Sequence, residues 1–114
     1  MGVSRFEELI AWQKAKVLCI EVYKVFEHTK DFGFKDQIQR ASVSIMNKIA
    51  EGFERKGNKE FAHFLYIAKG SCAEVRSMLI IAEELTKLPK ESADRLKSQA
   101  EEISKIISGL IKTL

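Results

Sequence analysis

Glu60 and His63 are separated by two residues, a spacing that places both side chains on one face of a helix. Pairs of this kind bind iron in four-helix di-iron proteins, where a second Glu-x-x-His pair and two further carboxylates complete the site. The other histidine of the chain, His28, has valine rather than glutamate three positions before it. The pattern therefore favours a surface histidine at position 63, and we expect no metal site.

The side chains that could act as nucleophiles lack the neighbours that would activate them. Cys19 and Cys72 are far apart, form no C-x-x-C pair and stand among apolar residues. This predicts two buried, reduced thiols, with a disulfide between them as the alternative. The serines in helical segments lack the glycines of a nucleophile elbow, and no glycine-rich phosphate loop is present. We therefore expect neither catalytic residues nor a cofactor, and a protein that is not an enzyme.

Basic side chains are the remaining candidates for chemistry, and phosphate is the group that they would bind. The candidate phosphate-facing set is Arg40, Arg55, Lys56 and Lys59. A cation at a helix C-terminus also stabilises the helix dipole, which by itself explains Arg55 and Lys56. The formal net charge is only +3, so the patch is weak in one copy and gains strength where identical subunits repeat it. No aromatic residues are spaced to stack successive bases, which predicts RNA or DNA binding with little base readout.

The composition describes the scaffold that must position these residues. The chain has 114 residues, of which 46% are apolar and 31% are charged, with one proline and six glycines. These values predict one ordered, all-α domain over residues 1–114. No apolar run approaches the ~18 residues of a membrane span, and no signal peptide opens the chain. We therefore expect a cytoplasmic protein without a membrane partner.

Four helical segments can be marked by their capping residues and breaks. We expect helices over about residues 4–29, 35–55, 59–86 and 89–114. Ser4 and Glu7 have the spacing of a capping box, and Gly33 stands at the centre of the first break. Asn58 is the expected N-cap of the third helix, and Pro89 suits the first turn of the fourth. Because short breaks make successive helices antiparallel, the expected fold is an up-down-up-down four-helix bundle.

Apolar residues at helical spacing predict the buried faces. The stripe of the last helix continues without a slip and includes Ile103 and Ile107. The second helix has two neighbouring stripes, Ile38, Ala41, Ile45 and Ile49 in one and Val43, Met46, Ala50 and Phe53 in the other. The first helix has a similarly broad apolar arc. A bundle helix needs only about 100° of apolar arc, so the surplus is either absorbed by a larger core or covered by self-association. The second stripe is the candidate assembly surface.

Gly70 stands in the middle of the third helix. Glycine there is less favourable than alanine by about 1 kcal/mol. Its position indicates the close approach of another helix.

Several blocks of the sequence are similar to one family. They are the segments 6–15, 37–45, 49–53, 59–61 and 64–71, together with Glu74. These blocks resemble the four-helix-bundle family encoded by intervening sequences inside bacterial 23S rRNA genes. That family is similar to the accessory variability protein of diversity-generating retroelements, a basic pentameric barrel that binds nucleic acid and the reverse transcriptase. The resemblance implies bundles that associate side by side into a homo-oligomeric ring, with five subunits favoured.

Two functions are compatible with the residues and the resemblance. One is a self-associating bundle that binds RNA or DNA, or serves as a reverse-transcriptase accessory protein, and the other is a protein-interaction scaffold without nucleic-acid binding. One position departs from the family, which usually has asparagine directly before Ile-Ala-Glu-Gly. Lys48 stands there instead, after Asn47, and is expected to pair with Glu51 or to face a phosphate. Ser44, Glu51, Ser71 and Glu74 match the family, and we interpret them as packing and assembly residues, because mid-helix polar side chains on facing helices can satisfy one another.

Overall fold

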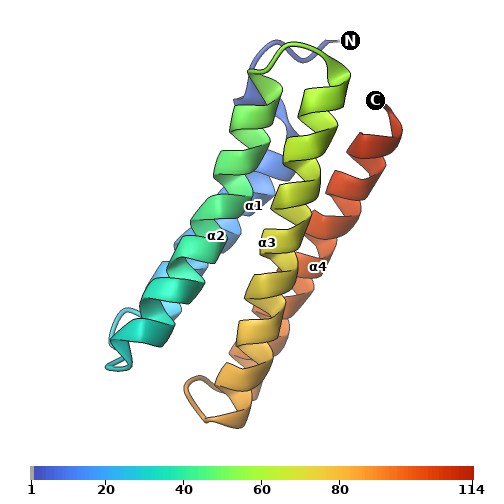
Figure 1. Cartoon of the computed structure of the whole chain (residues 1–114). Helices are drawn as coiled ribbons and strands as arrows, with labels where there is room; N and C mark the ends of the chain where they lie inside the picture. Colours follow the sequence, from blue (N-terminus) through green and yellow to red (C-terminus); the bar gives the residue numbers. More distant parts are fainter. Residues whose placement is uncertain (1) are drawn as a thin grey trace.

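The computed structural model describes residues 2–114, and four long helices account for most of them. Their bounds are α1 Ile10–Val25, α2 Phe32–Phe53, α3 Asn58–Glu84 and α4 Lys90–Lys112, and one short 3-10 helix, η1 Phe6–Glu8, precedes them. No strand occurs over these residues. The helices run alternately up and down (Figure 1), so the predicted antiparallel four-helix bundle is confirmed.

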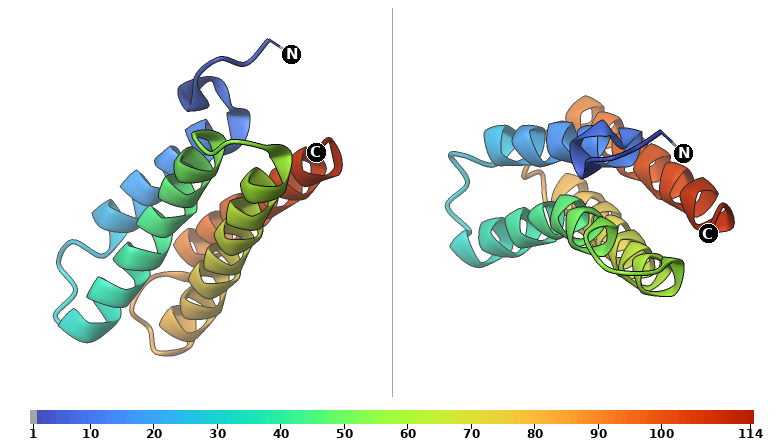
Figure 2. Two further views of the ribbon diagram at one scale, coloured as in Figure 1. Left: turned by 45° about the horizontal axis from the view of Figure 1, so that its top comes forward. Right: turned by 90° about the horizontal axis from the view of Figure 1, so that it is seen from above.

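Each helix packs on the helices before and after it in the chain, and α4 returns to pack on α1. As a result α1 and α3 lie at opposite corners of the bundle, as do α2 and α4 (Figure 2, right). The bundle is elongated and measures 44 × 21 × 19 Å. Each helix therefore turns one side to the core, two flanks to its neighbours and one outer face away from the bundle.

The predicted apolar stripes form the core. Ile103 and Ile107 of α4 are 1% and 0% exposed, and the first stripe of α2 is buried from Ile38 to Ile49. Phe26, just after α1, is also fully buried. Side chains three and four positions apart thus fill the axis of the bundle, as the periodicity predicts.

The start of the first helix differs from the expectation. The predicted capping box is wrong, because the backbone N–H of Ser4 donates to Glu8 Oε1 at 2.9 Å and the Ser4 side chain caps no helix. Leu9 is extended and buried, and it separates η1 from α1. The Phe6 ring packs edge-on against Trp12, 5.3 Å between centroids. Packing Phe6 and Leu9 against the end of the bundle therefore takes the place of a helix that continues unbroken from residue 4.

The first break also lies earlier than expected. α1 ends at Val25 and α2 begins at Phe32, so Gly33 belongs to the first turn of α2. Asp31 is the cap, and its Oδ1 accepts the backbone N–H of Phe34 at 3.2 Å. Its Oδ2 accepts from Lys87 Nζ in the α3–α4 turn at 3.1 Å. Both bonds lower the pKa of the Asp31 carboxyl, and the bond from the Phe34 backbone has the larger effect.

The helices α2 and α3 approach closely at Gly52, near the turn that joins them. A Cβ on Gly52 would lie 2.6 Å from the Phe64 Cβ and 3.0 Å from Phe61 Cδ1. Gly57 then takes φ +90°, which favours glycine, and occupies the N-cap position expected for Asn58. Asn58 is the first residue of α3, so that prediction is wrong by one residue.

Gly70 makes no such approach within the chain. Beyond its own turn of helix, nothing lies within 4 Å of the position that a Gly70 Cβ would take. The expected close helix contact is therefore found at Gly52 and not at Gly70.

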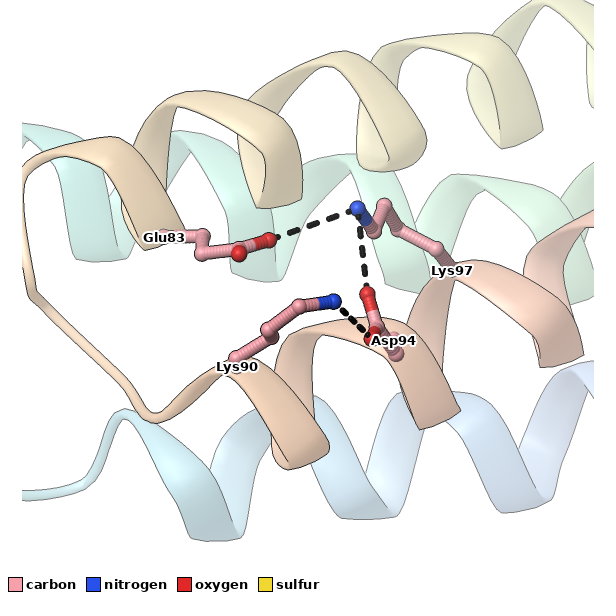
Figure 3. Close-up of polar contacts among 4 residues, drawn as sticks. All are labelled: Glu83, Lys90, Asp94 and Lys97. Atoms are coloured by element: carbon pink, nitrogen blue, oxygen red, sulfur yellow. Dashed lines mark hydrogen bonds and ion pairs between the residues drawn. The ribbon is translucent and has the colours of Figure 1, made fainter.

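The α3–α4 end carries a small ion-pair network at its surface (Figure 3). Lys97 Nζ lies 3.4 Å from both Glu83 Oε1 and Asp94 Oδ1, and Lys90 Nζ lies 2.8 Å from Asp94 Oδ2. Pro89 precedes α4 at the N-cap position rather than lying in its first turn. Exposed pairs of this kind contribute little to stability, so the apolar axis supplies most of the stability of the fold.

We expect Ile103→Ala or Ile107→Ala to lower the free energy of unfolding by about 2–5 kcal/mol, because each leaves a cavity in the bundle axis. Chemical denaturation at one fixed protein concentration measures the effect. Lys105→Ala, an exposed change on the same helix, is the matched control and should leave the free energy near the wild-type value. A loss below about 1 kcal/mol for both isoleucines would contradict the burial of α4.

We expect Gly52→Ala to lower the free energy of unfolding by about 1–3 kcal/mol, because its Cβ overlaps the Phe64 Cβ and overpacks the contact. Gly109→Ala on α4 is the control, since nothing lies within 4 Å of that Cβ position. There the better helix propensity of alanine should leave stability unchanged or raised. Equal stability of the two variants in denaturant would show that the α2–α3 contact does not require glycine at position 52.

Candidate nucleic-acid interface and assembly faces

Three of the four candidate phosphate-binding residues lie together at the α2–α3 turn. α2 ends at Phe53 and α3 begins at Asn58, so Arg55, Lys56 and Lys59 are exposed at one end of the bundle. Among the residues described, neither lysine has a carboxylate within 4 Å (residues 2–114). Their charge is therefore available to an external anion.

Arg55 is held more firmly than the two lysines. Its guanidinium lies 4.9 Å from the centre of the Phe64 ring, a cation–π distance. It also lies 3.8 Å from Glu60 Oε1, which partly neutralises it. Phe64, whose Cβ packs against Gly52, thus fixes where the basic turn presents this charge.

Arg40 lies apart from the other three. Fifteen residues of chain separate it from Arg55, which is roughly 20 Å along a helix. Its Nε donates to Asp36 Oδ2 at 2.8 Å, and this bond raises the pKa of Arg40 while compensating its charge. The structure therefore groups Arg55, Lys56 and Lys59, named here the basic turn, and leaves Arg40 outside it.

Arg40 opens onto a shallow groove of about 360 Å³ that runs along α2. Lys48 lines the same groove and pairs with Glu51 at 3.3 Å, which confirms one of the two expectations for Lys48. Its Nζ also lies 5.8 Å from the centre of the Phe64 ring. Because each cation of the groove faces a carboxylate, the groove has little net charge and is a weaker phosphate site than the basic turn.

The remaining polar candidates have structural roles. Ser71 Oγ donates to Ser44 Oγ at 3.0 Å, which confirms that these serines satisfy each other between α3 and α2. Cys19 and Cys72 are free and buried, as expected. Burial raises the pKa of the Cys72 thiol to about 12, so it carries no thiolate near neutral pH.

The Glu-x-x-His pair does not converge on a common ligand position. Glu60 is turned to Arg55, and His63 is exposed with its ring against Phe64, 5.9 Å between centroids. Over residues 2–114, no three side chains of the metal-binding types come together.

The predicted assembly stripe of α2 is only half-buried. Met46 and Phe53 pack against the core, and Val43 and Ala50 lie at its margin. The large apolar side chains that are exposed lie elsewhere, and α1 and α3 carry most of them, namely Ile10, Val17, Ile20, Tyr23, Tyr66, Ile67, Ile80, Ile81 and Leu85. The broad apolar arc expected for the first helix agrees with the exposure of Ile10, Val17 and Ile20. No such surface on α3 is predicted from the sequence, although its exposed apolar residues lie off the buried stripe of that helix.

Within residues 2–114, no helix combines the length and the apolar character that a membrane crossing requires.

Comparison with a solved structure supports the fold. A protein of unknown function from the S23 ribosomal protein family of Bacteroides thetaiotaomicron superposes with a TM-score of 0.85. It is 22% identical to this chain, and the match covers 90% of this chain and 99% of that one. At this identity the likeness shows the fold alone. Among curated proteins none matches the sequence.

Comparison with family models identifies the relationship that the sequence blocks indicate. The model described as 23S rRNA-intervening sequence protein matches residues 7–109. The matched region begins in η1 and ends within α4, so it covers α1, α2 and α3 and most of α4. The protein therefore belongs to the 23S rRNA-intervening sequence protein family.

Proposed function

We propose that this protein is a non-enzymatic, self-associating helical bundle that binds the phosphate backbone of RNA or DNA without reading its sequence. The observation that carries the proposal is the basic turn. Lys56 and Lys59 extend from one end of the bundle with no carboxylate within 4 Å in the described chain, and Arg55 lies beside them. Three cations bind phosphate weakly, so useful affinity requires several copies on one nucleic acid.

The surroundings of the basic turn support binding without base readout. The rings of Phe53, Phe61 and Phe64 lie next to it along the chain, and each is buried or half-buried. Arg55 covers the Phe64 ring. Recognition of single strands relies on exposed rings on which bases stack. The basic turn is therefore suited to contact phosphates and not to stack bases.

Self-association is supported by the apolar side chains that α1 and α3 leave exposed. Contiguous exposed apolar surface of this kind marks protein interfaces. The resemblance to the retroelement accessory protein favours five subunits in a ring. The two free thiols fit a reducing compartment, and we place the protein in the cytoplasm.

A narrower form of the proposal is a reverse-transcriptase accessory protein, which the sequence resemblance implies. It requires a reverse transcriptase as a second partner. Co-purification with a reverse transcriptase encoded beside the gene would support this form, and a gene located inside an rRNA gene would argue against it.

The alternative is a protein-interaction scaffold without nucleic-acid binding. The modest net charge of +3 favours it, because dedicated nucleic-acid binders usually have a stronger excess of basic residues. Both functions use the exposed apolar faces, and only the first uses the basic turn.

We expect wild-type protein to bind labelled RNA and duplex DNA of unrelated sequences alike at ~50 mM salt, and to release both as salt rises. Lys56→Glu with Lys59→Glu should weaken binding by about tenfold or more and lower the salt slope by about one unit for each lysine. The fold should persist, since a glutamate in the first turn of α3 favours the helix dipole. Fluorescence anisotropy across a salt series measures both effects.

Lys30→Glu with Lys105→Glu is the matched control, because it makes the same change in net charge at exposed sites outside the basic turn. An equal loss of binding in this control would assign the effect to net charge and overturn the basic turn as the site. Absence of wild-type binding at ~50 mM salt, where screening is weak, would replace the nucleic-acid proposal by the scaffold.

A further inference from the structure

Most of the exposed large apolar side chains belong to two helices, α1 and α3, that are not neighbours in the bundle. Four lie on the outer side of α1 and four on that of α3, where Tyr66 is 61% exposed, and Leu85, which directly follows α3, is 56% exposed. In the described chain α2 contributes only its first residue, Phe32, and α4 contributes none. We name these two surfaces the α1 outer face and the α3 outer face. Because α1 and α3 lie at opposite corners (Figure 2, right), the two faces point away from each other.

The charges on the two faces have opposite sign. Lys16 and Lys24 flank the apolar residues of the α1 outer face, and Glu74 and Glu84 lie among those of the α3 outer face. All four are exposed, and none forms an ion pair within residues 2–114. Contact between two α1 faces would oppose lysines, and contact between two α3 faces would oppose glutamates. Only α1 against α3 pairs unlike charges.

The spacing of the charges also matches. Lys16 and Lys24 are about 12 Å apart along α1, and Glu74 and Glu84 are about 15 Å apart along α3. Flexible lysine side chains can span this difference. Two charges at the ends of the faces depart from this pattern: Glu27 lies beyond α1, with its Oε2 3.2 Å from His28 Nε2, and Lys59 lies in the first turn of α3. Both lie outside the segments from Lys16 to Lys24 and from Glu74 to Glu84.

The two faces lie at the same level of the bundle. Through α2, the Cys19–Ser42 and Ser44–Ser71 contacts place a residue of α1 level with one about 54 positions later in α3. Through α4, the Lys14–Glu102 and Arg76–Glu101 pairs give about 61 positions. Lys16 and Glu74, like Lys24 and Glu84, are separated by about 60 positions, within this range. Copies placed side by side without an axial shift therefore bring these charges together.

We propose that the α1 outer face of one copy packs in parallel against the α3 outer face of the next copy, with Lys16 near Glu74 and Lys24 near Glu84. This inference rests on the self-association proposed above and assigns its surface. Since the two faces differ, the contact is heterologous and repeats from copy to copy, closing into a ring where the rotation allows. Gly70, near the middle of the α3 outer face, leaves room for a neighbouring helix that the chain itself does not supply.

Charge reversal tests the pairing directly. Lys16→Glu with Lys24→Glu, and separately Glu74→Lys with Glu84→Lys, should each weaken self-association by about tenfold or more, because like charges then face each other. The combined fourfold variant exchanges the charges and should recover most of the wild-type association. Sedimentation velocity and light scattering across a concentration series measure assembly, and circular dichroism confirms that each variant is folded.

Gly70→Gln adds an independent, uncharged test. The change leaves the isolated bundle folded, since no other part of the chain approaches that position, and it should reduce assembly by filling the contact. Lys30→Glu with Lys105→Glu is the control and should assemble like the wild type.

A wild type that remains a 13.0 kDa monomer at tens of micromolar, the range of ordinary interfaces, would overturn self-association and this pairing together. Wild-type assembly that none of the variants alters, or loss in both double variants without recovery in the fourfold variant, would overturn this pairing and leave self-association standing.

Discussion

The arrangement of the bundle depends on the close approach of α2 and α3 at Gly52. A side chain there would overlap Phe64, because a Cβ on Gly52 would lie only 2.6 Å from the Phe64 Cβ. The approach brings the Phe53 and Phe61 rings into edge contact, 5.8 Å between centroids, and lets the chain reverse over residues 54–57 with Gly57 at φ +90°. Because Arg55 then lies over the Phe64 ring, the position of the basic turn follows from the same contact.

Stability and recognition are carried by different parts of this molecule. The axis of the bundle is apolar, and the Ser44–Ser71 bond is one of the few polar contacts that cross between helices near the core. The ion pairs lie at the surface, where solvent screens them and their contribution to folding is small. Surface charges can therefore be reversed for binding experiments with little effect on the fold, whereas changes along the axis affect folding first.

The neighbour-to-neighbour packing of four antiparallel helices has a consequence for assembly. It leaves α1 and α3 as helices that are not neighbours, and these two helices carry most of the exposed apolar side chains. In the proposed parallel association every copy would point the same way, so every basic turn would lie on the same rim. The weak charge of one turn would then be repeated around that rim, which links the assembly proposal to the phosphate-binding proposal through multivalency.

The sequence by itself determined the four helices, their antiparallel order and the buried stripes of α2 and α4, because helical periodicity and near-neighbour spacing express these features directly. It left two partners open for Lys48, and the structure chose Glu51. It misplaced the start of α1, the first break and the cap of α3, and it assigned the close helix approach to Gly70. Only the tertiary structure decided these points, since each depends on which distant side chain fills the adjacent space: Phe6 and Leu9 at the bundle end, Asp31 against Lys87, Phe64 against Gly52. The separation of Arg40 from the basic turn and the exposure of the α3 outer face have the same origin, because periodicity shows which residues share a face but not which face a neighbouring helix covers.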